Sequence, residues 1–115
     1  MALSEFEEKR FEKVVRAYRD EIRPLPHIRK DLDIGYRIEN QSVFLFEIRP
    51  VWRSPQEKHE IPIFKATYVK STKEWKLYWM RASGKWELYE PNPYADTLEG
   101  IIDTVREDEF ACFFG

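Results

Sequence analysis

The side chains best suited to acid–base chemistry are Glu47, Lys65 and the two histidines, His27 and His59. A carboxylate, an amine and an imidazole within hydrogen-bond reach of one another could move a proton at neutral pH. Both histidines fall in segments expected to be loops, and the sequence has no motif with metal-ligand spacing. A small enzyme built around Glu47, Lys65 and a histidine is therefore an alternative hypothesis, and we expect no metal and no cofactor.

A second set of side chains suits the binding of an anion. Cationic groups bind phosphate or carboxylate, phenol rings offer planes for stacking, and an acidic residue between them would orient the cations. The same set also fits a solvated sheet face with ion pairs between Glu47 and either Lys65 or Arg49. The alternation of the sequence predicts that the following candidate residues share one face: Arg37, Glu47, Arg49, Lys65, Tyr78 and Tyr89.

The positions of these side chains depend on strands that the sequence indicates between residues 34 and 90. Apolar and charged residues alternate there with a period of two, which is typical of strands with one buried and one solvated face. We predict strands at 33–39, 43–52, 61–70, 75–82 and 85–90. The buried face is expected to carry Ile34, Tyr36, Ile38, Phe44, Phe46, Ile48, Phe64, Ala66, Tyr68, Leu77, Trp79, Trp86 and Leu88.

The register of these strands depends on the turns, because a slip of one residue moves every side chain to the other face. A three-residue loop at 40–42 would place Ile38 and Phe44 on the same face. Residues 83–84, Ser-Gly, are predicted to form a two-residue turn into the last strand. Residues 53–60 are polar and include a proline, so we predict an exposed loop there.

Helices are predicted at both ends of the chain. Ser4 followed by Glu7 is a capping box, and the helix that it begins should end before Pro24. Asp96 with Glu99 predicts the start of a shorter C-terminal helix. The aromatic residues at 113–114 then either dock on the protein's own core or form a contact between two copies.

Composition limits the classes of protein to consider. The 115 residues are 43% hydrophobic, and we expect one domain that spans residues 1–115. The formal net charge of −2 gives the whole molecule no attraction to nucleic acid or to anionic lipid, so only a local patch could supply it. The lone cysteine, Cys112, fits the cytoplasm. The apolar run at 43–46 is too short to cross a membrane, and we expect no membrane association.

Several short motifs, in their order and spacing, resemble a family of small bacterial proteins known as domain of unknown function number three thousand and twenty-four. The resemblance covers nearly the whole chain and implies a bacterial cytoplasmic protein, but it implies no activity or catalytic residue. Phe114 stands where many relatives are expected to have Trp. The motifs are Pro26-His27-Ile28-Arg29, Gly35-Tyr36-Arg37-Ile38, Glu47-Ile48-Arg49-Pro50, Trp75-Lys76-Leu77-Tyr78-Trp79, Lys85-Trp86 and Phe113-Phe114-Gly115.

The sequence thus predicts an α+β fold, with an N-terminal helix, a five-stranded antiparallel meander and a short C-terminal helix on the same sheet face. The leading functional hypothesis is a non-catalytic binding module whose open sheet face binds nucleic acid or an acidic protein segment. One alternative is a self-associating structural protein, for example a homodimer, joined through edge strands or the aromatic C-terminal tail. The other alternative is the small enzyme described above.

Overall fold

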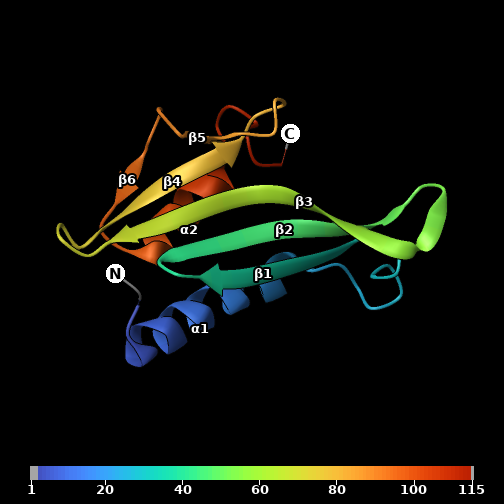
Figure 1. Ribbon diagram of the computed structural model, residues 1–115, viewed down its shortest axis with the longest axis horizontal. Helices are drawn as coiled ribbons and strands as arrows, with labels where there is room; N and C mark the ends of the chain where they lie inside the picture. Colours follow the sequence, from blue (N-terminus) through green and yellow to red (C-terminus); the bar gives the residue numbers. More distant parts are fainter. Residues whose placement is uncertain (1–2, 115) are drawn as a thin grey trace.

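The computed structural model describes residues 3–114 and shows two helices packed against one antiparallel sheet (Figure 1). Strands β1 to β5 follow one another in sequence order, and β6 pairs with β4 beside β5. The predicted α+β class and meander are confirmed. The elements are α1 (Glu5–Ile22), β1 (Asp33–Glu39), β2 (Ser42–Val51), β3 (Ser54–Val69), β4 (Glu74–Met80), β5 (Trp86–Leu88), β6 (Tyr94–Ala95) and α2 (Leu98–Glu107).

Helix α1 begins at the predicted capping box. The Ser4 hydroxyl accepts a hydrogen bond from the Glu7 backbone N–H at 3.1 Å, and the Glu7 carboxylate accepts one from the Ser4 N–H at 2.9 Å. These two bonds satisfy donors that the first turn leaves unpaired. The residues that α1 buries against the sheet are spaced three and four apart: Phe11, Val15 and Tyr18.

Both helices cover the same face of the sheet, as the sequence predicts, and one core joins all the layers (Figure 1). The Phe11 ring meets the Trp75 ring edge-on, with centroids 4.7 Å apart. From α2, Ile101 and Val105 are almost completely buried in the same core. Helix α2 begins after Thr97, whose hydroxyl accepts from Gly100 N–H, so the predicted cap at Asp96 is wrong by one residue.

The first hairpin has a two-residue turn, so the predicted three-residue loop is wrong. Glu39 pairs with Ser42 across the ladder, and Asn40 adopts the positive φ, 55°, that begins the turn. The one-residue difference turns β2 over. The β2 residues that face the helices are therefore Val43 and Leu45, and Phe44, Phe46 and Ile48 lie on the opposite, open face of the sheet.

The segment predicted as a loop at 53–60 is instead the first half of the long strand β3. Its ladder with β2 continues to Val51 and Ser54, and Trp52 and Arg53 form the turn. Strand β1 pairs with β2 only as far as Ile48, so the end of this hairpin extends beyond the rest of the sheet (Figure 1). We call residues 49–61 the β-arm.

In the last hairpin the turn is one residue longer than predicted. Met80 pairs with Trp86 and Tyr78 with Leu88, and the Arg81 N–H donates to the Lys85 carbonyl. The turn therefore contains three residues, with φ of 83° at Gly84, and not the predicted two. Strand β5 is consequently also turned over. Trp86 and Leu88 lie on the open face, although the sequence predicts them in the core.

The C-terminal tail docks on the protein's own core. The Phe113 ring is 7% exposed, and its centroid lies 4.9 Å from that of Tyr89. Asp108 ends α2 in the left-handed region and accepts hydrogen bonds from the backbone N–H groups of Phe113 and Phe114 at 2.9 and 2.8 Å. Of the two roles considered for the tail, the structure shows the intramolecular one.

Candidate functional site

One row of side chains crosses the open face of the sheet at a single level. Directly paired residues of an antiparallel sheet lie on the same face, and four successive pairings join β1 to β5. No helix covers this side of the sheet among residues 3–114 (Figure 1). The residues of this open-face row are Arg37, Phe44, Lys65, Tyr78 and Leu88.

Lys65 stands at the centre of the row among aromatic rings. Its Nζ lies 4.6 Å from the ring centroid of Tyr78 and 5.7 Å from that of Trp86. Burial lowers the pKa of the Lys65 ammonium below its usual value, and no charged group in the described part of the chain contributes to this shift. A cation in contact with rings and without a carboxylate is available to an anionic group that approaches the face.

A hollow of about 190 Å³ lies beside the row, with apolar walls and a charged rim. The rings of Phe44 and Trp86 meet in it with centroids 6.1 Å apart and planes 58° apart. At the rim, the Arg37 guanidinium lies 4.6 Å from the Phe46 ring centroid and forms an ion pair with Glu60. The hollow therefore combines flat apolar surfaces with one donor group and one acceptor group.

Three of the six predicted site residues share this face, namely Arg37, Lys65 and Tyr78. The predicted positions of the other three are wrong, and the reason is the turn lengths. Glu47 pairs with Ile34 and, because β2 is turned over, lies on the side of the sheet that the helices cover. Arg49 binds Glu47 on that side, with Nε 3.0 Å from Oε1.

Tyr89 is the third misplaced residue. It is 2% exposed within the core, and burial raises the pKa of its phenol. The phenol of Tyr89 offers no surface for stacking, so its predicted role is not available in this arrangement. The ion pair between Glu47 and Arg49 that the sequence suggests does form.

The residues of the enzyme hypothesis are not brought together. Glu47 and Lys65 lie on opposite faces of the sheet. The hollow that contains Glu47 is lined by helix, β1 and tail residues, and neither His27 nor His59 is among them. Within residues 3–114, no group of three His, Cys, Asp or Glu side chains is placed to hold a metal ion. Among the described residues, the histidines and the lysine of this hypothesis therefore do not line the hollow that contains Glu47.

The comparison with protein families uses nearly the whole chain. A family model described as Domain of unknown function (DUF3024) matches residues 3–115. The chain belongs to the DUF3024 family. No curated protein and no solved structure matches it significantly.

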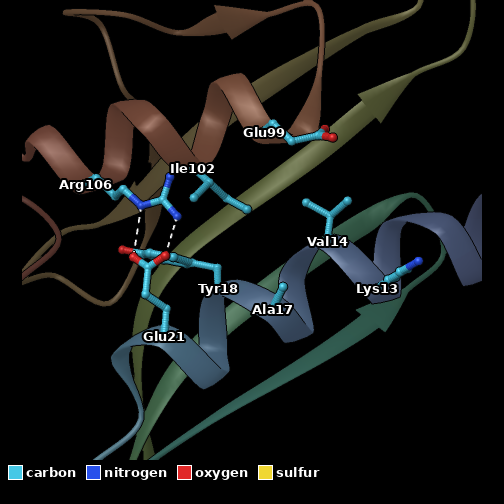
Figure 2. Close-up of a pocket in the computed structure, with 8 residues that line it drawn as sticks. All are labelled: Lys13, Val14, Ala17, Tyr18, Glu21, Glu99, Ile102 and Arg106. Carbon is cyan, nitrogen blue, oxygen red and sulfur yellow. Dashed lines mark hydrogen bonds and ion pairs between the residues drawn. The ribbon is translucent and has the colours of Figure 1, made fainter.

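A groove of about 340 Å³ separates the two helices of this DUF3024 chain (Figure 2). Val14 and Ala17 form one wall and Ile102 the other, and Arg106 closes one end by a paired contact with Glu21, with N–O distances of 3.0 and 2.6 Å. Because Arg106 and Glu21 neutralise each other, this end of the groove ties α1 to α2.

In the described part of the chain, no helix is both long and apolar enough to cross a membrane.

Sequence reasoning missed five members of the open face of this DUF3024 chain, because it assigned them to the core: Phe44, Phe46, Ile48, Trp86 and Leu88. For the members on β2, a signal exists in the sequence. Residues 43–46 are all apolar, which indicates a strand with apolar contacts on both faces. Such a strand supplies one set of side chains to the helix-covered core and a second set to the open face.

Proposed function

We propose that the protein is a non-catalytic binding module that holds single-stranded nucleic acid on the open face of its sheet. The observation that carries this proposal is Lys65, a cation that contacts the rings of Tyr78 and Trp86 and forms no ion pair with a carboxylate of residues 3–114. Single strands are bound where aromatic rings stack on bases and cations meet the phosphates. The open face places both kinds of group at one level of the sheet.

The aromatic rings favour nucleic acid over the other anionic partner, an acidic protein segment. An acidic peptide offers carboxylates to Lys65, but its acidic side chains offer no aromatic face that could stack on the rings of Phe44 and Trp86. A nucleotide satisfies both requirements, because every base has a face on which a ring can stack. The acidic peptide is therefore the competing ligand in the test.

The number of unpaired cations sets the expected strength of binding. Arg37 is paired with Glu60 and lies near Glu39, so we count two cations on the described part of this face, Lys65 and Lys76, as available to phosphates. For a single strand, two phosphate contacts give a slope of log affinity against log salt of about −1.4. We therefore expect modest affinity that falls gently with salt. We place this function in the bacterial cytoplasm, in agreement with the family resemblance and the single cysteine.

The test is a titration of a labelled oligothymidylate at several salt concentrations. Lys65→Met should weaken binding and reduce the slope by about half, to about −0.7. Lys13→Gln is the matched control, because Lys13 is an exposed cation on α1, on the other side of the sheet. Unchanged affinity and slope in Lys65→Met, or tighter binding of a glutamate-rich peptide than of the oligonucleotide, would overturn the proposal.

A further inference from the structure

We infer that the β-arm is a second contact for the same strand, with Trp52 as a stacking platform at its tip. Trp52 is 85% exposed, the largest exposed fraction among the large hydrophobic side chains that the structure describes. Its ring is held at a two-residue turn, where the Arg53 guanidinium lies 5.4 Å from the ring centroid. This inference rests on the proposed function, since it names where the bound strand continues.

The charge of the arm agrees with a nucleic-acid partner. Between positions 49 and 61 the β-arm has three basic residues, Arg49, Arg53 and Lys58, and two acidic residues, Glu57 and Glu60, although the overall charge of the chain is −2. Arg49 is paired with Glu47. Lys58 donates to a neutral group, the Lys30 carbonyl, at 2.8 Å, and this contact does not neutralise the ammonium. The tip therefore combines an uncovered indole with cations that attract phosphates.

The arm and the open face are continuous, because β2 and β3 form both. The hairpin runs from Phe44 and Lys65 in the open-face row to Trp52 at the turn. Eight residues of strand span about 26 Å at 3.3 Å for each residue. That length corresponds to about eight stacked nucleotides at 3.4 Å each. A strand of about four nucleotides bound at Lys65 cannot reach Trp52, whereas one of about sixteen can.

The experiment compares these two lengths of oligothymidylate on full-length wild type and Trp52→Ala, by fluorescence anisotropy at low salt. Trp52→Ala removes the ring on which a base would stack at the arm, so the affinity of this variant for the longer strand should be lower by about 5-fold to 150-fold. Affinity for the shorter strand should not change. Trp52→Phe keeps a ring and should lose less than Trp52→Ala.

Phe6→Ala is the matched control, because Phe6 is also an exposed ring, at 73%, but lies on α1. It should bind both strands as the wild type does. If Trp52→Ala binds the longer strand as tightly as the wild type, the arm contact is overturned and the open-face proposal stands. If neither strand binds the wild-type protein, both proposals are overturned.

Discussion

Gly35 lies directly opposite Phe46 in the β1–β2 ladder, and the Phe46 ring occupies the space that a side chain at residue 35 would need. A β-carbon on Gly35 would be 2.6 Å from Cε2 of that ring. The ring is 7% exposed although it lies on the open face, because Arg37 covers it. Gly35 is thus required for close approach, because it lets the Phe46 ring pack directly against β1.

Gly35→Ala should lower the free energy of unfolding by about 1–3 kcal/mol, because the ring is forced away from its packed position. Urea unfolding measures this loss. The double variant Gly35→Ala with Phe46→Leu removes part of the ring and should recover stability relative to the sum of the two single changes. If the losses of stability in the two single variants simply add in the double variant, the clash with the Phe46 ring is not the cause of the Gly35→Ala effect.

The sequence allowed the strands, the helices and their common face to be predicted, because β1, β3 and β4 alternate clearly. Arg37, Lys65 and Tyr78 lie on these strands, and their predicted face is confirmed. Strand β2 could not be assigned in this way, since Val43 and Phe44 are both apolar and either face satisfies the pattern.

For such a strand the turn decides the face, and the two turn lengths could not be read from composition. Asn40-Gln41-Ser42 permits a two- or a three-residue turn, and Ser83-Gly84 is equally compatible with either. Each error of one residue moved a whole strand. Glu47, Arg49 and Tyr89 were misplaced for this reason alone, so the sequence supplied three of the six candidate residues on the open face.

Phe113→Ala should destabilise the protein by about 3–5 kcal/mol, because the ring is packed against Tyr89 in the core. Phe110→Ala should change stability by no more than about 0.5 kcal/mol, since Phe110 is 59% exposed. Thermal or urea unfolding distinguishes the two variants. Equal, small effects would show that the tail is not part of the core.

The Phe110→Ala variant also tests self-association through the tail. If the aromatic tail joined two copies, Phe110→Ala would lower the sedimentation coefficient of the native protein without unfolding it. We expect no such change, because the buried ring of the tail already has an intramolecular partner in Tyr89. A concentration-dependent shift that Phe110→Ala abolishes would contradict this expectation.

The stability of the protein should fall in alkaline solution through the ionisation of Tyr18. Burial raises the pKa of the Tyr18 phenol to about 12 from its ordinary value of 10.0, although the Arg106 guanidinium opposes the change. Both the folded and the unfolded states keep this proton below pH 10. Between pH 10 and about 12 the unfolded state ionises first, so stability is lost, by about 2–3 kcal/mol for this group.

Urea unfolding at about pH 9 and at about pH 11.5 measures the effect. Tyr18→Phe is the matched control, because the ring remains in the core and cannot ionise. The variant should lose less stability than the wild type over this interval. An equal loss in the two proteins would assign the alkaline instability to other tyrosines.

Lys65→Met should affect stability and binding in different ways. The Lys65 ammonium is partly buried without an ion pair among the described residues, which leaves it available to a ligand but lowers the stability of the free protein. Burial lowers the pKa of this ammonium, so the folded state binds its proton less tightly than the unfolded state does. Below its folded pKa the charged lysine therefore carries an uncompensated cost, and stability rises as the pH increases through the interval between its folded pKa and the ordinary value of 10.5.

Methionine has a similar length, fills the same space between Tyr78 and Trp86 and has no charge to desolvate. The variant should consequently be at least as stable as the wild type at neutral pH, and the rise in stability toward pH 10.5 should be smaller, while oligothymidylate binding weakens. Urea unfolding at neutral and alkaline pH, together with the binding titration, measures these effects. A large loss of stability at neutral pH would mean that the contacts of the ammonium with the two rings outweigh its desolvation, and that Lys65 is a structural residue of the open face.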